Sequence, residues 1–409
     1  MSRLNELIQE LCPNGVEHKT LSELFNTRNG YTPSRSNQEF WTNGTIPWFR
    51  MEDIRENGRI LSEATQYVSE SAVKGNLFPA NSIIVATSAT IGEHALITVP
   101  SLANQRFTYL MLKDQYKDMF DAKFLYYYCF KLDIYCKECL NQGNFASVDM
   151  KKFAKFEFPL VPLEVQREIV RILDNFTELT AELTAELTAE LTARKKQYEY
   201  YRNKLLSFSV LNKSGGVILF KKLREIAEYS HKRINAAAMK KANYVGVDNL
   251  LQNRAGKVGS NYVPTKGNLT AYVVGDVLIG NIRPYLKKIW LAYNEGGASG
   301  DVLVIHLTDQ SVDVKYLYQV LADDKFFNYN MQFAKGAKMP RGSKQKIMDY
   351  IIPVPSLEEQ RRIVSILDKF DMLTTSISEG LPKEIELRRK QYEYYRNQLL
   401  SFPDNKATA

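Results

Sequence analysis

Side chains suited to contacting a polyanion are concentrated in a loop late in the sequence. From Lys335 to Lys344 the chain carries the cations Lys335, Lys338, Arg341 and Lys344 and no acidic residue. Lysine and arginine in such a loop can neutralise phosphate groups and release their counterions. Arg283, in a short turn that precedes this loop in the sequence, is a further candidate cation. The sequence therefore predicts a phosphate-contacting surface in this part of the chain.

Two earlier loops are rich in side chains that hydrogen-bond phosphates and base edges. The first spans residues 26–37, and its counterpart spans residues 229–235. A third polar stretch, residues 141–147, lies where the first half of the chain places the equivalent of the basic loop, but it is uncharged. Taken singly, such loops are more often solvated turns, whereas their recurrence at equivalent places in two halves favours DNA contact. The candidate DNA-contacting residues in these loops are Arg28, Tyr31, Thr32, Ser34, Arg35, Asn144, Lys232 and Arg233.

Motifs of catalysis are missing from the sequence. It has no G-x-x-x-x-G-K-[ST] loop for nucleotide phosphates, no H-E-x-x-H metal pair and no G-x-S-x-G nucleophile turn. The segment from Asn281 to Tyr285 is distantly similar to the Asn-Pro-Pro-Tyr motif of amino-methyltransferases. However, it lacks the adjacent prolines, and no glycine-rich methyl-donor loop accompanies it. We therefore expect the chain to catalyse nothing by itself.

The four cysteines predict neither a disulfide framework nor a metal site. Cys136 and Cys139 form a C-x-x-C with Cys129 nearby, in an aromatic and aliphatic segment that predicts a buried helix. No second cysteine or histidine pair complements them in the sequence, so a packing role is favoured over zinc binding.

The composition is that of an ordinary soluble globular protein. Of the 409 residues 44% are hydrophobic and 24% are charged, and the net charge of +8 permits a polyanionic partner without demanding one. The length suits two or three domains. No apolar run approaches the ~20 residues of a membrane helix, and the first residues have no apolar signal core, so the cytoplasm is the expected location.

A duplicated segment organises the chain. The residues from Gln166 to Asn203 recur from Gln360 to Asn397, with a constant offset of 194 positions and identical Gln-Tyr-Glu-Tyr-Tyr-Arg-Asn endings. Each copy follows a longer and less regular segment, and these two segments hardly resemble one another. Tandem duplication of a helical part with divergent globular parts predicts a protein that holds two different readers in a fixed relation.

Both copies are predicted to be helical and to pack as an antiparallel, coiled-coil-like pair. In the first copy an apolar stripe passes through Thr-Ala-Glu-Leu units at 180–183, 184–187 and 188–191, and the second copy keeps the apolar positions without the units. Four residues advance the stripe by about 40°, so two such helices stay in contact by winding about one another. A solvated low-complexity helix is the alternative. Gly380 and Pro382 should break or kink the second helix. The stripe residues are Leu179, Leu183, Leu187, Leu191, Leu373, Ile377, Leu381 and Ile385.

The segment before each helical copy is predicted to be α+β, with strands first and a helix later. Short apolar runs bounded by turn residues predict the strands, and longer apolar stretches predict the helices. The predicted strands are residues 83–86, 95–99, 107–111, 271–274, 277–279 and 302–305, and the predicted helices are residues 122–140 and 314–327. The predicted domains are residues 1–158, 159–210, 211–352 and 353–409.

The whole chain resembles the specificity subunit of a type I restriction–modification system, in the branch with Thr-Ala-Glu-Leu helix repeats. Residues 30–33, followed by residues 40–48, are similar to that family's opening to a recognition domain. Residues 159–166 and 353–360 are similar to its domain-to-helix junction. The paired helix endings and the tetrapeptide tandem complete the match, while the second copy departs from the pattern by lacking the tetrapeptides.

The resemblance implies two target-recognition domains that alternate with two helical spacers in a pseudo-twofold duplication. It also implies a non-catalytic subunit that binds a bipartite, asymmetric DNA target, with one half-site per recognition domain. The implied partners are two methyltransferase subunits and the restriction subunits. S-adenosylmethionine, ATP and Mg would be used by those partners and not by this chain.

A duplicated chain offers two near-equivalent patches, so one copy of it can recruit a symmetric pair of partner subunits. Cations and tyrosines near the ends of the two helical copies are candidate contacts for such partners. Their alternative role is to cap the helix pair. The candidate subunit-contact residues are Arg194, Lys195, Lys196, Tyr198, Arg388, Arg389, Lys390 and Tyr392.

Two questions remain open at the level of sequence. The main alternative to a DNA-reading subunit is a scaffold that joins two partners through its helices, without sequence-specific DNA binding. The second question is the role of the tetrapeptide tandem. One unit adds about 6 Å of helix, which is at most about two base pairs of DNA, so the tandem could act as a ruler between the readers. The rival interpretation is a tolerant linker.

Overall fold

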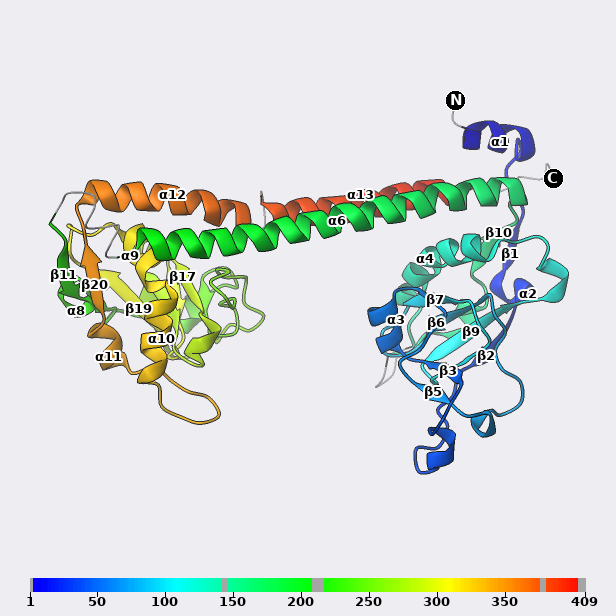
Figure 1. Cartoon of the computed structure of the whole chain (residues 1–409), viewed down its shortest axis with the longest axis horizontal. Helices are drawn as coiled ribbons and strands as arrows, with labels where there is room; N and C mark the ends of the chain where they lie inside the picture. The colour runs from blue at the N-terminus through cyan, green and yellow to red at the C-terminus, as the bar shows by residue number, and fades with distance from the viewer. Residues whose placement is uncertain (1–2, 142–145, 208–216, 376–379, 404–409) are drawn as a thin grey trace. The chain divides into compact units, whose positions relative to one another are not determined.

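The computed structural model describes residues 3–141, 146–207, 217–375 and 380–403. The chain divides into two compact units (Figure 1). Unit 1 comprises Met1–Leu183 with Arg388–Ala409, and unit 2 comprises Thr184–Leu387. Each is α+β, as predicted. The finer domain boundaries expected from the sequence stay predictions.

Unit 1 contains a mixed sheet in the order β2-β9-β6-β7-β4 and a second sheet in the order β5-β3-β8. The strands of the first sheet are β2 (Phe25–Asn29), β4 (Ile60–Leu61), β6 (Ser82–Ala86), β7 (His94–Ile97) and β9 (Phe107–Leu112). Those of the second are β3 (Ile46–Phe49), β5 (Tyr67–Val68) and β8 (Leu102–Ala103). A separate antiparallel pair joins β1 (His18–Thr20) to β10 (Glu157–Pro159). The predicted strands at 83–86, 95–99 and 107–111 are β6, β7 and β9, and their apolar runs are buried as central strands require.

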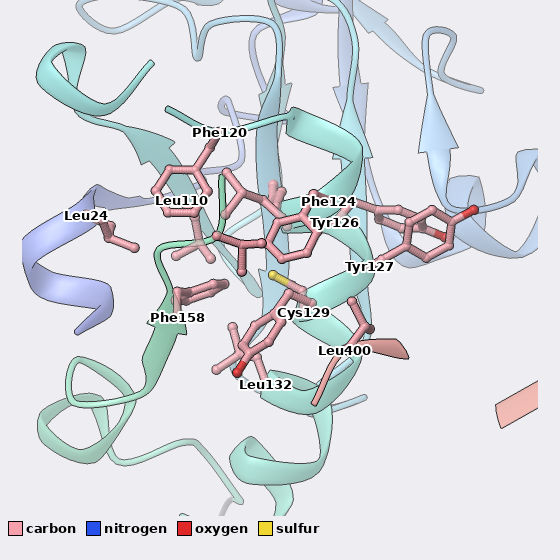
Figure 2. Close-up of a cluster of buried hydrophobic side chains, with 14 of the residues drawn as sticks. Leu24, Leu110, Phe120, Phe124, Tyr126, Tyr127, Cys129, Leu132, Phe158 and Leu400 are labelled. Atoms are coloured by element: carbon pink, nitrogen blue, oxygen red, sulfur yellow. The ribbon is translucent and has the colours of Figure 1, made fainter. Parts of the chain in front are cut away.

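Unit 1 has further helices besides those of the duplicated segments. They are α1 (Arg3–Leu11), α2 (Leu21–Leu24), α3 (Met51–Asn57), α4 (Ala122–Glu138) and α5 (Met150–Phe153), with 3-10 turns η1 (Gln38–Phe40), η2 (Glu70–Ala72) and η3 (Asp114–Tyr116). Helix α4, predicted at 122–140, packs its buried face into the main core. Figure 2 shows Phe124, Cys129 and Leu132 of this helix beside Phe158, with Leu400 from the C-terminal segment in the same cluster. Cys129 and Cys136 are therefore core residues.

Unit 2 has sheets in the orders β12-β19-β16-β17 and β13-β15-β18-β14, and an antiparallel pair β11-β20. The strands are β11 (Leu219–Lys222), β12 (Ala227–Tyr229), β13 (Arg233–Asn235), β14 (Tyr244–Val245), β15 (Asn268–Tyr272), β16 (Val277–Gly280), β17 (Ile289–Leu291), β18 (Gly296–Ala298), β19 (Val302–Leu307) and β20 (Ile351–Val354). The predicted strands at 271–274, 277–279 and 302–305 correspond to the end of β15, to β16 and to β19. The helices are α8 (Leu223–Ile226), α9 (Val314–Leu321), α10 (Asp324–Gln332) and α11 (Lys344–Met348), with η5 (Ala236–Ala238) and η6 (Pro284–Leu286).

The single helix predicted at 314–327 is wrong, because two helices, α9 and α10, occupy this region. Asp323 ends the continuity, since its side chain caps α10 by accepting a hydrogen bond from the Lys325 N–H at 2.8 Å. The repeat offset explains the break. It is 192 at the helix start, where Asp121 matches Asp313, and 194 at the helix end. Unit 2 thus has two extra residues where unit 1 has the continuous helix α4.

The duplicated segments form α6 (Leu163–Leu205), α12 (Leu357–Thr375) and α13 (Leu381–Leu399). Within unit 1, α6 packs on α13: the rings of Phe176 and Tyr395 are 6.0 Å apart and Thr177 Oγ1 lies 2.8 Å from the Tyr392 hydroxyl. Within unit 2, α6 packs on α12, where the rings of Tyr201 and Phe370 are 5.3 Å apart. The predicted helix pairing is thus present in each unit.

The interruption expected at Gly380 and Pro382 is confirmed. Helix α12 ends at Thr375, and α13 begins at Leu381 with Pro382 as its second residue. Proline is tolerated in the first turn of a helix, where its missing N–H has no intrahelical partner. The proline is therefore compatible with the start of α13, although it would break a continuous helix.

The predicted stripe is only partly covered. Leu183, Leu187, Leu191, Leu381 and Ile385 are half-buried, whereas Leu179 is 59% exposed. Ile377 lies outside the described residues, and the side chain of Leu373 is likewise not described. Among the described residues no helix is long and apolar enough to cross a membrane.

Candidate nucleic-acid interface

In unit 1 several loops meet at one edge of the main sheet. Strands β2 and β6 end where β9 begins, because Asn29 pairs with Thr108 and Ala86 pairs with Phe107. Side chains tie the three strands together: Thr108 Oγ1 donates to Asn29 Oδ1 at 2.8 Å and lies 3.1 Å from Thr87 Oγ1. We call this place edge 1. It comprises residues 29–32, 87–91, 104–106 and 146–148.

A hairpin is bound to the turn that follows β6. The Asn141 N–H donates to the Ser147 carbonyl at 2.9 Å, and the Val148 N–H donates to the Thr87 carbonyl at 2.9 Å. Ser88 and Ser147 form an isolated β-bridge. Asn141 and Ser147 are the ends of the uncharged stretch that was predicted to be the equivalent of the basic loop of unit 2. The candidate Asn144 lies outside the described residues.

Two of the predicted DNA contacts in unit 1 take part in internal packing. Tyr31 is half-buried, and its hydroxyl donates to the Ala72 carbonyl at 3.2 Å and accepts from the Lys74 N–H at 2.7 Å. Arg28 is exposed on β2, but its guanidinium lies 4.0 Å from the Phe78 ring centroid and donates to the Asn76 carbonyl at 2.7 Å. Both side chains therefore help to hold the loops that surround them.

The other candidates lie on the loop after β2. Arg35 stacks over the Trp41 ring at 3.8 Å and donates to Gln66 Oε1 at 3.1 Å. Ser34 and Ser36 hydroxyls are 2.8 Å apart. Thr32 donates to Gln105 at edge 1. Their roles in DNA contact stay predictions.

The equivalent place in unit 2, edge 2, comprises residues 281–285, 299–301 and 335–342. Strand β16 ends against the beginning of β19, and the Asn281 N–H donates to the Asp301 carbonyl at 2.8 Å. Lys335 and Arg341 close a hairpin through paired backbone bonds of 2.9 and 2.8 Å. The Gly342 N–H donates to the Asn281 carbonyl at 3.2 Å, which binds that hairpin to the turn after β16.

Edge 2 brings four predicted cations together. Lys335 and Lys338 are exposed on the hairpin, and Arg283 is exposed on the turn, where its N–H donates to the Pro340 carbonyl at 2.7 Å. Arg341 differs from the others, because its Nε lies 3.2 Å from Asp301 Oδ1. The loop itself carries no acid, but the fold supplies one from the start of β19. Asp301 and Arg341 are 40 positions apart in the sequence, so their pairing could not be predicted from the loop alone. The pairing partly neutralises the charge of Arg341.

The remaining candidates of unit 2 lie beside this group. Lys344 is exposed at the start of α11, and its carbonyl accepts from the Tyr229 hydroxyl at 2.9 Å. Lys232 and Arg233 are exposed at β13, in the other sheet, where Arg233 donates to Thr270 Oγ1 at 3.0 Å. No described contact joins them to the hairpin.

The residues beneath the two hairpins differ in kind. Under the hairpin of unit 2, Asn330 is 1% exposed, and a Cβ added to Gly342 would collide with its side-chain oxygen. By the offset of 194, the matching residues of unit 1 are Cys136 and Val148, which lie in one buried apolar cluster. An amide therefore takes in unit 2 the space that an apolar side chain fills in unit 1.

Edge 1 also contains residues that are not among the predicted contacts. Gln105 and Arg106 occupy the turn between β8 and β9, and the Thr87 N–H donates to the Arg106 carbonyl at 3.0 Å. Ala89, which is exposed, and Ser88, which is half-buried, follow β6. A polar turn between two predicted strands, Asn104 to Arg106, was the available signal for the first pair.

The junctions between the globular parts and the long helices repeat bond for bond. In unit 1, Gln166 Oε1 accepts from the Asp121 N–H at 2.8 Å, and its Nε2 donates to the carbonyls of Met119 and Val161 at 2.8 and 2.5 Å. In unit 2 the matching glutamine makes the matching bonds. Gln360 accepts from Asp313 at 2.8 Å and donates to Ser311 and Pro355 at 2.9 and 2.8 Å.

An ion pair repeats beside each glutamine. Lys123 Nζ lies 2.7 Å from Asp174 Oδ2, and Lys315 Nζ lies 2.7 Å from Asp368 Oδ2. The hydrogen bond to Asp368 raises the pKa of Lys315. The junctions therefore fix each helix against its globular part with buried amide bonds and a partly exposed ion pair.

The predicted subunit contacts fall into two groups. Tyr198 is 6% exposed and donates to Gln319 Oε1 at 3.3 Å, and burial raises its pKa. This burial favours the capping of the helix pair over contact with a partner subunit. The matching Tyr392 is half-buried over Thr177. Lys195, Lys196, Arg389 and Lys390 are exposed, and Arg194 and Arg388 are half-buried.

The comparisons with known proteins agree with this architecture. The model of the type I restriction modification DNA specificity domain matches residues 13–193 and again residues 219–387. The type I restriction enzyme EcoprrI specificity subunit of Escherichia coli is 44% identical over 402 residues, which is 93% of this chain and 93% of that protein. The EcoR124I/EcoR124II specificity subunit of Escherichia coli is 34% identical over 274 residues, covering 60% and 61% of the two chains.

Solved structures share the fold. A structure described under the assembly and conformational transition of the type I R-M system has a TM-score of 0.64 at 14% identity, covering 94% of this chain and 97% of that one. The HsdS subunit from Thermoanaerobacter tengcongensis has a TM-score of 0.51 at 14% identity, covering 95% and 96%. The chain belongs to the type I restriction–modification DNA specificity family, and it carries that family's domain twice.

Proposed function

We propose that edge 1 and edge 2 each read one half of a bipartite DNA target, so that the chain specifies an asymmetric sequence. The observation that carries this proposal is the shared backbone of the two edges. Each edge binds a hairpin to the turn that follows a central strand, β6 in unit 1 and β16 in unit 2. The bond joins Val148 to Thr87 in unit 1 and Gly342 to Asn281 in unit 2. The side chains presented on this common backbone are different, as two readers of different sequences require.

The proposal extends to the complex in which the chain works. We propose two methyltransferase subunits and the restriction subunits as its partners, and no catalysis by this chain alone. S-adenosylmethionine would be held by the methyltransferase subunits, with ATP and Mg used by the restriction subunits. Family membership supports these assignments, because specificity subunits of type I restriction enzymes are the relatives of this chain.

An exchange of one reader tests the proposal. Residues 217–350 are replaced by the same region of a relative, and the methylated sequence is determined in cells that contain the partner subunits. One half of the target should change and the other half should stay the same, because the units have separate cores. A change in both halves would contradict independent reading.

The scaffold alternative predicts a different result in a simpler measurement. A mobility-shift assay with the assembled methyltransferase complex should show preference for target DNA over a scrambled duplex. Equal binding to both duplexes, at matched salt, would favour a scaffold that joins its partners without reading sequence.

A further inference from the structure

The two edges share a second feature, which lies in the backbone conformation. Ala89 and Arg283 both have positive φ angles, 65° and 52°. They occupy matching positions, because their numbers differ by the repeat offset of 194. For residues other than glycine this left-handed conformation is uncommon, and it costs about 1 kcal/mol or more. Neither copy has the glycine that would remove the cost.

The surroundings hold each left-handed residue in place. Ser88 bridges Ser147 immediately before Ala89, and Ile282 bridges Arg341 immediately before Arg283. In unit 2 the Arg283 N–H also donates to the Pro340 carbonyl at 2.7 Å. The residue thus lies where the turn, the hairpin and the neighbouring strand are bound together. A side chain on such a support starts from a fixed position, which favours geometric recognition.

Ala89 and Arg283 are both exposed, and their side chains differ in size and charge, as expected of two readers of different sequences. Position 89 offers a methyl group, and position 283 offers a planar guanidinium with paired donors. The hairpin next to Arg283 already carries the flexible cations Lys335 and Lys338, which suit phosphate neutralisation. An arginine whose backbone is held in place suits a base edge, because bidentate contact with guanine O6 and N7 needs a defined direction.

We propose that positions 89 and 283 are specificity-determining, and that Arg283 donates both hydrogen bonds of a bidentate contact to one guanine in the half-site of unit 2. The proposal rests on the proposed function, since it names the residue through which edge 2 reads. At the matching position, the Ala89 methyl group is suited to apolar contact with a thymine methyl in the other half-site.

The first test measures sequence preference position by position. The chain is assembled with the methyltransferase subunits of its own system, and bound DNA is sequenced after selection from randomised half-sites. Arg283→Ala should lower the preference at one position of one half-site about tenfold and leave the other half-site unchanged. Arg283→Lys should not restore that preference, because an ammonium group lacks the guanidinium fork. Asn253→Gly, at another left-handed residue of unit 2, is the control that should keep the wild-type profile.

Two outcomes would overturn the proposal. One is an unchanged profile in Arg283→Ala. The other is a uniform loss of affinity for all sequences that Arg283→Lys restores, which indicates a phosphate contact. Failure of the proposed function looks different, since the wild-type complex itself would then select no sequence.

A second variant separates reading from folding. Arg283→Gly relieves the left-handed strain, so its unfolding midpoint should rise by about 1–2 °C while the guanine preference is lost as in Arg283→Ala. A lower midpoint would assign Arg283 a structural role and overturn the proposal.

Discussion

The junctions and the edges of this chain repeat in different ways. At the junctions, Gln166 and Gln360 make the same three hydrogen bonds, and a lysine–aspartate pair recurs beside each. At the edges only main-chain bonds recur, and the presented side chains change from Ser147 to Arg341. Repetition of side chains thus marks the parts that fix each reader to its helix. Repetition of backbone alone marks the parts whose side chains are free to differ.

A broken junction should destabilise the chain more than any other single change proposed here. Gln360→Ala leaves one backbone N–H and two carbonyls of unit 2 without their partner in a site that is 0% exposed. An unsatisfied buried group costs about 1–3 kcal/mol, so we expect a loss of about 3 kcal/mol in the free energy of unfolding of unit 2. Urea denaturation of the chain measures it.

Unit 1 offers the matching variant. Gln166→Ala should destabilise unit 1 by a similar amount, because its bonds match. Gln398→Ala, at an exposed position of α13, serves as the control and should change stability by less than about 0.5 kcal/mol. Unequal losses in the two glutamine variants would show that the junctions are less alike than their bonds.

The next effect concerns the cations of edge 2. Replacing both Lys335 and Lys338 by alanine should weaken binding to all DNA sequences alike. The slope of log K against log salt should fall by about 0.9 for each lost phosphate contact. Arg341→Ala should have a smaller effect, because Asp301 already pairs with this side chain. Binding titrations at several salt concentrations test this, with Lys325→Ala on α10 as an exposed control. Unchanged affinity and slope in the double variant would remove the hairpin from the interface.

The tetrapeptide tandem lies between the first junction and the second globular part. Chains with two, three and four Thr-Ala-Glu-Leu units should recognise the same half-sites, while the unread spacer grows by about one base pair per unit. Methylome sequencing of cells that carry each chain measures the spacer. A constant spacer across the series would reduce the tandem to a linker that tolerates changes in length.

A weaker effect is expected from loss of the ion pair between Lys221 and Asp309, which has no counterpart between the same positions of unit 1. The hydrogen bond from Lys221 to Asp309, at 2.6 Å, lowers the pKa of Asp309 from 3.8 to about 2. Lys19, which takes the place of Lys221 in the matching strand pair of unit 1, pairs with Glu17 instead. Because the folded pKa is depressed, the stabilisation is complete above about pH 4 and is lost as the pH falls towards 2. Asp309→Asn should therefore cost about 1 kcal/mol at pH 7, after allowance for solvent screening, and progressively less below pH 4. A cost that is independent of pH would point to packing instead of charge.

The sequence predicted the architecture because its signals were local. Apolar runs located β6, β9, β16 and β19, and the repeat located the long helices. The split between α9 and α10 was missed, because the single helix predicted at 314–327 ran across Asp323, which is a helix cap. The two extra residues of unit 2 in this region become visible only when the two halves are aligned through their helix caps.

The candidate interface was harder to predict, because it is assembled from distant segments. Four of the predicted cations meet at edge 2, but Asp301, the residue before β19, also pairs with Arg341, and no loop sequence could show this. In unit 1 the predicted Tyr31 and Arg28 are engaged with neighbouring backbone. The left-handed residues Ala89 and Arg283 have no sequence signal of their own, since glycine is the residue that normally predicts this conformation.

The fit between Gly342 and Asn330 limits how such a chain can be reshuffled by recombination. A crossover that imported only a hairpin of the unit 1 type would place a valine-like side chain on the buried Asn330 amide. Viable exchanges must carry α10 and the hairpin together, just as Cys136 and Val148 share one apolar cluster in unit 1. Genetic exchange is thereby directed towards whole readers, and intermediates with grafted loops would be lost through poor folding before their specificity could be selected.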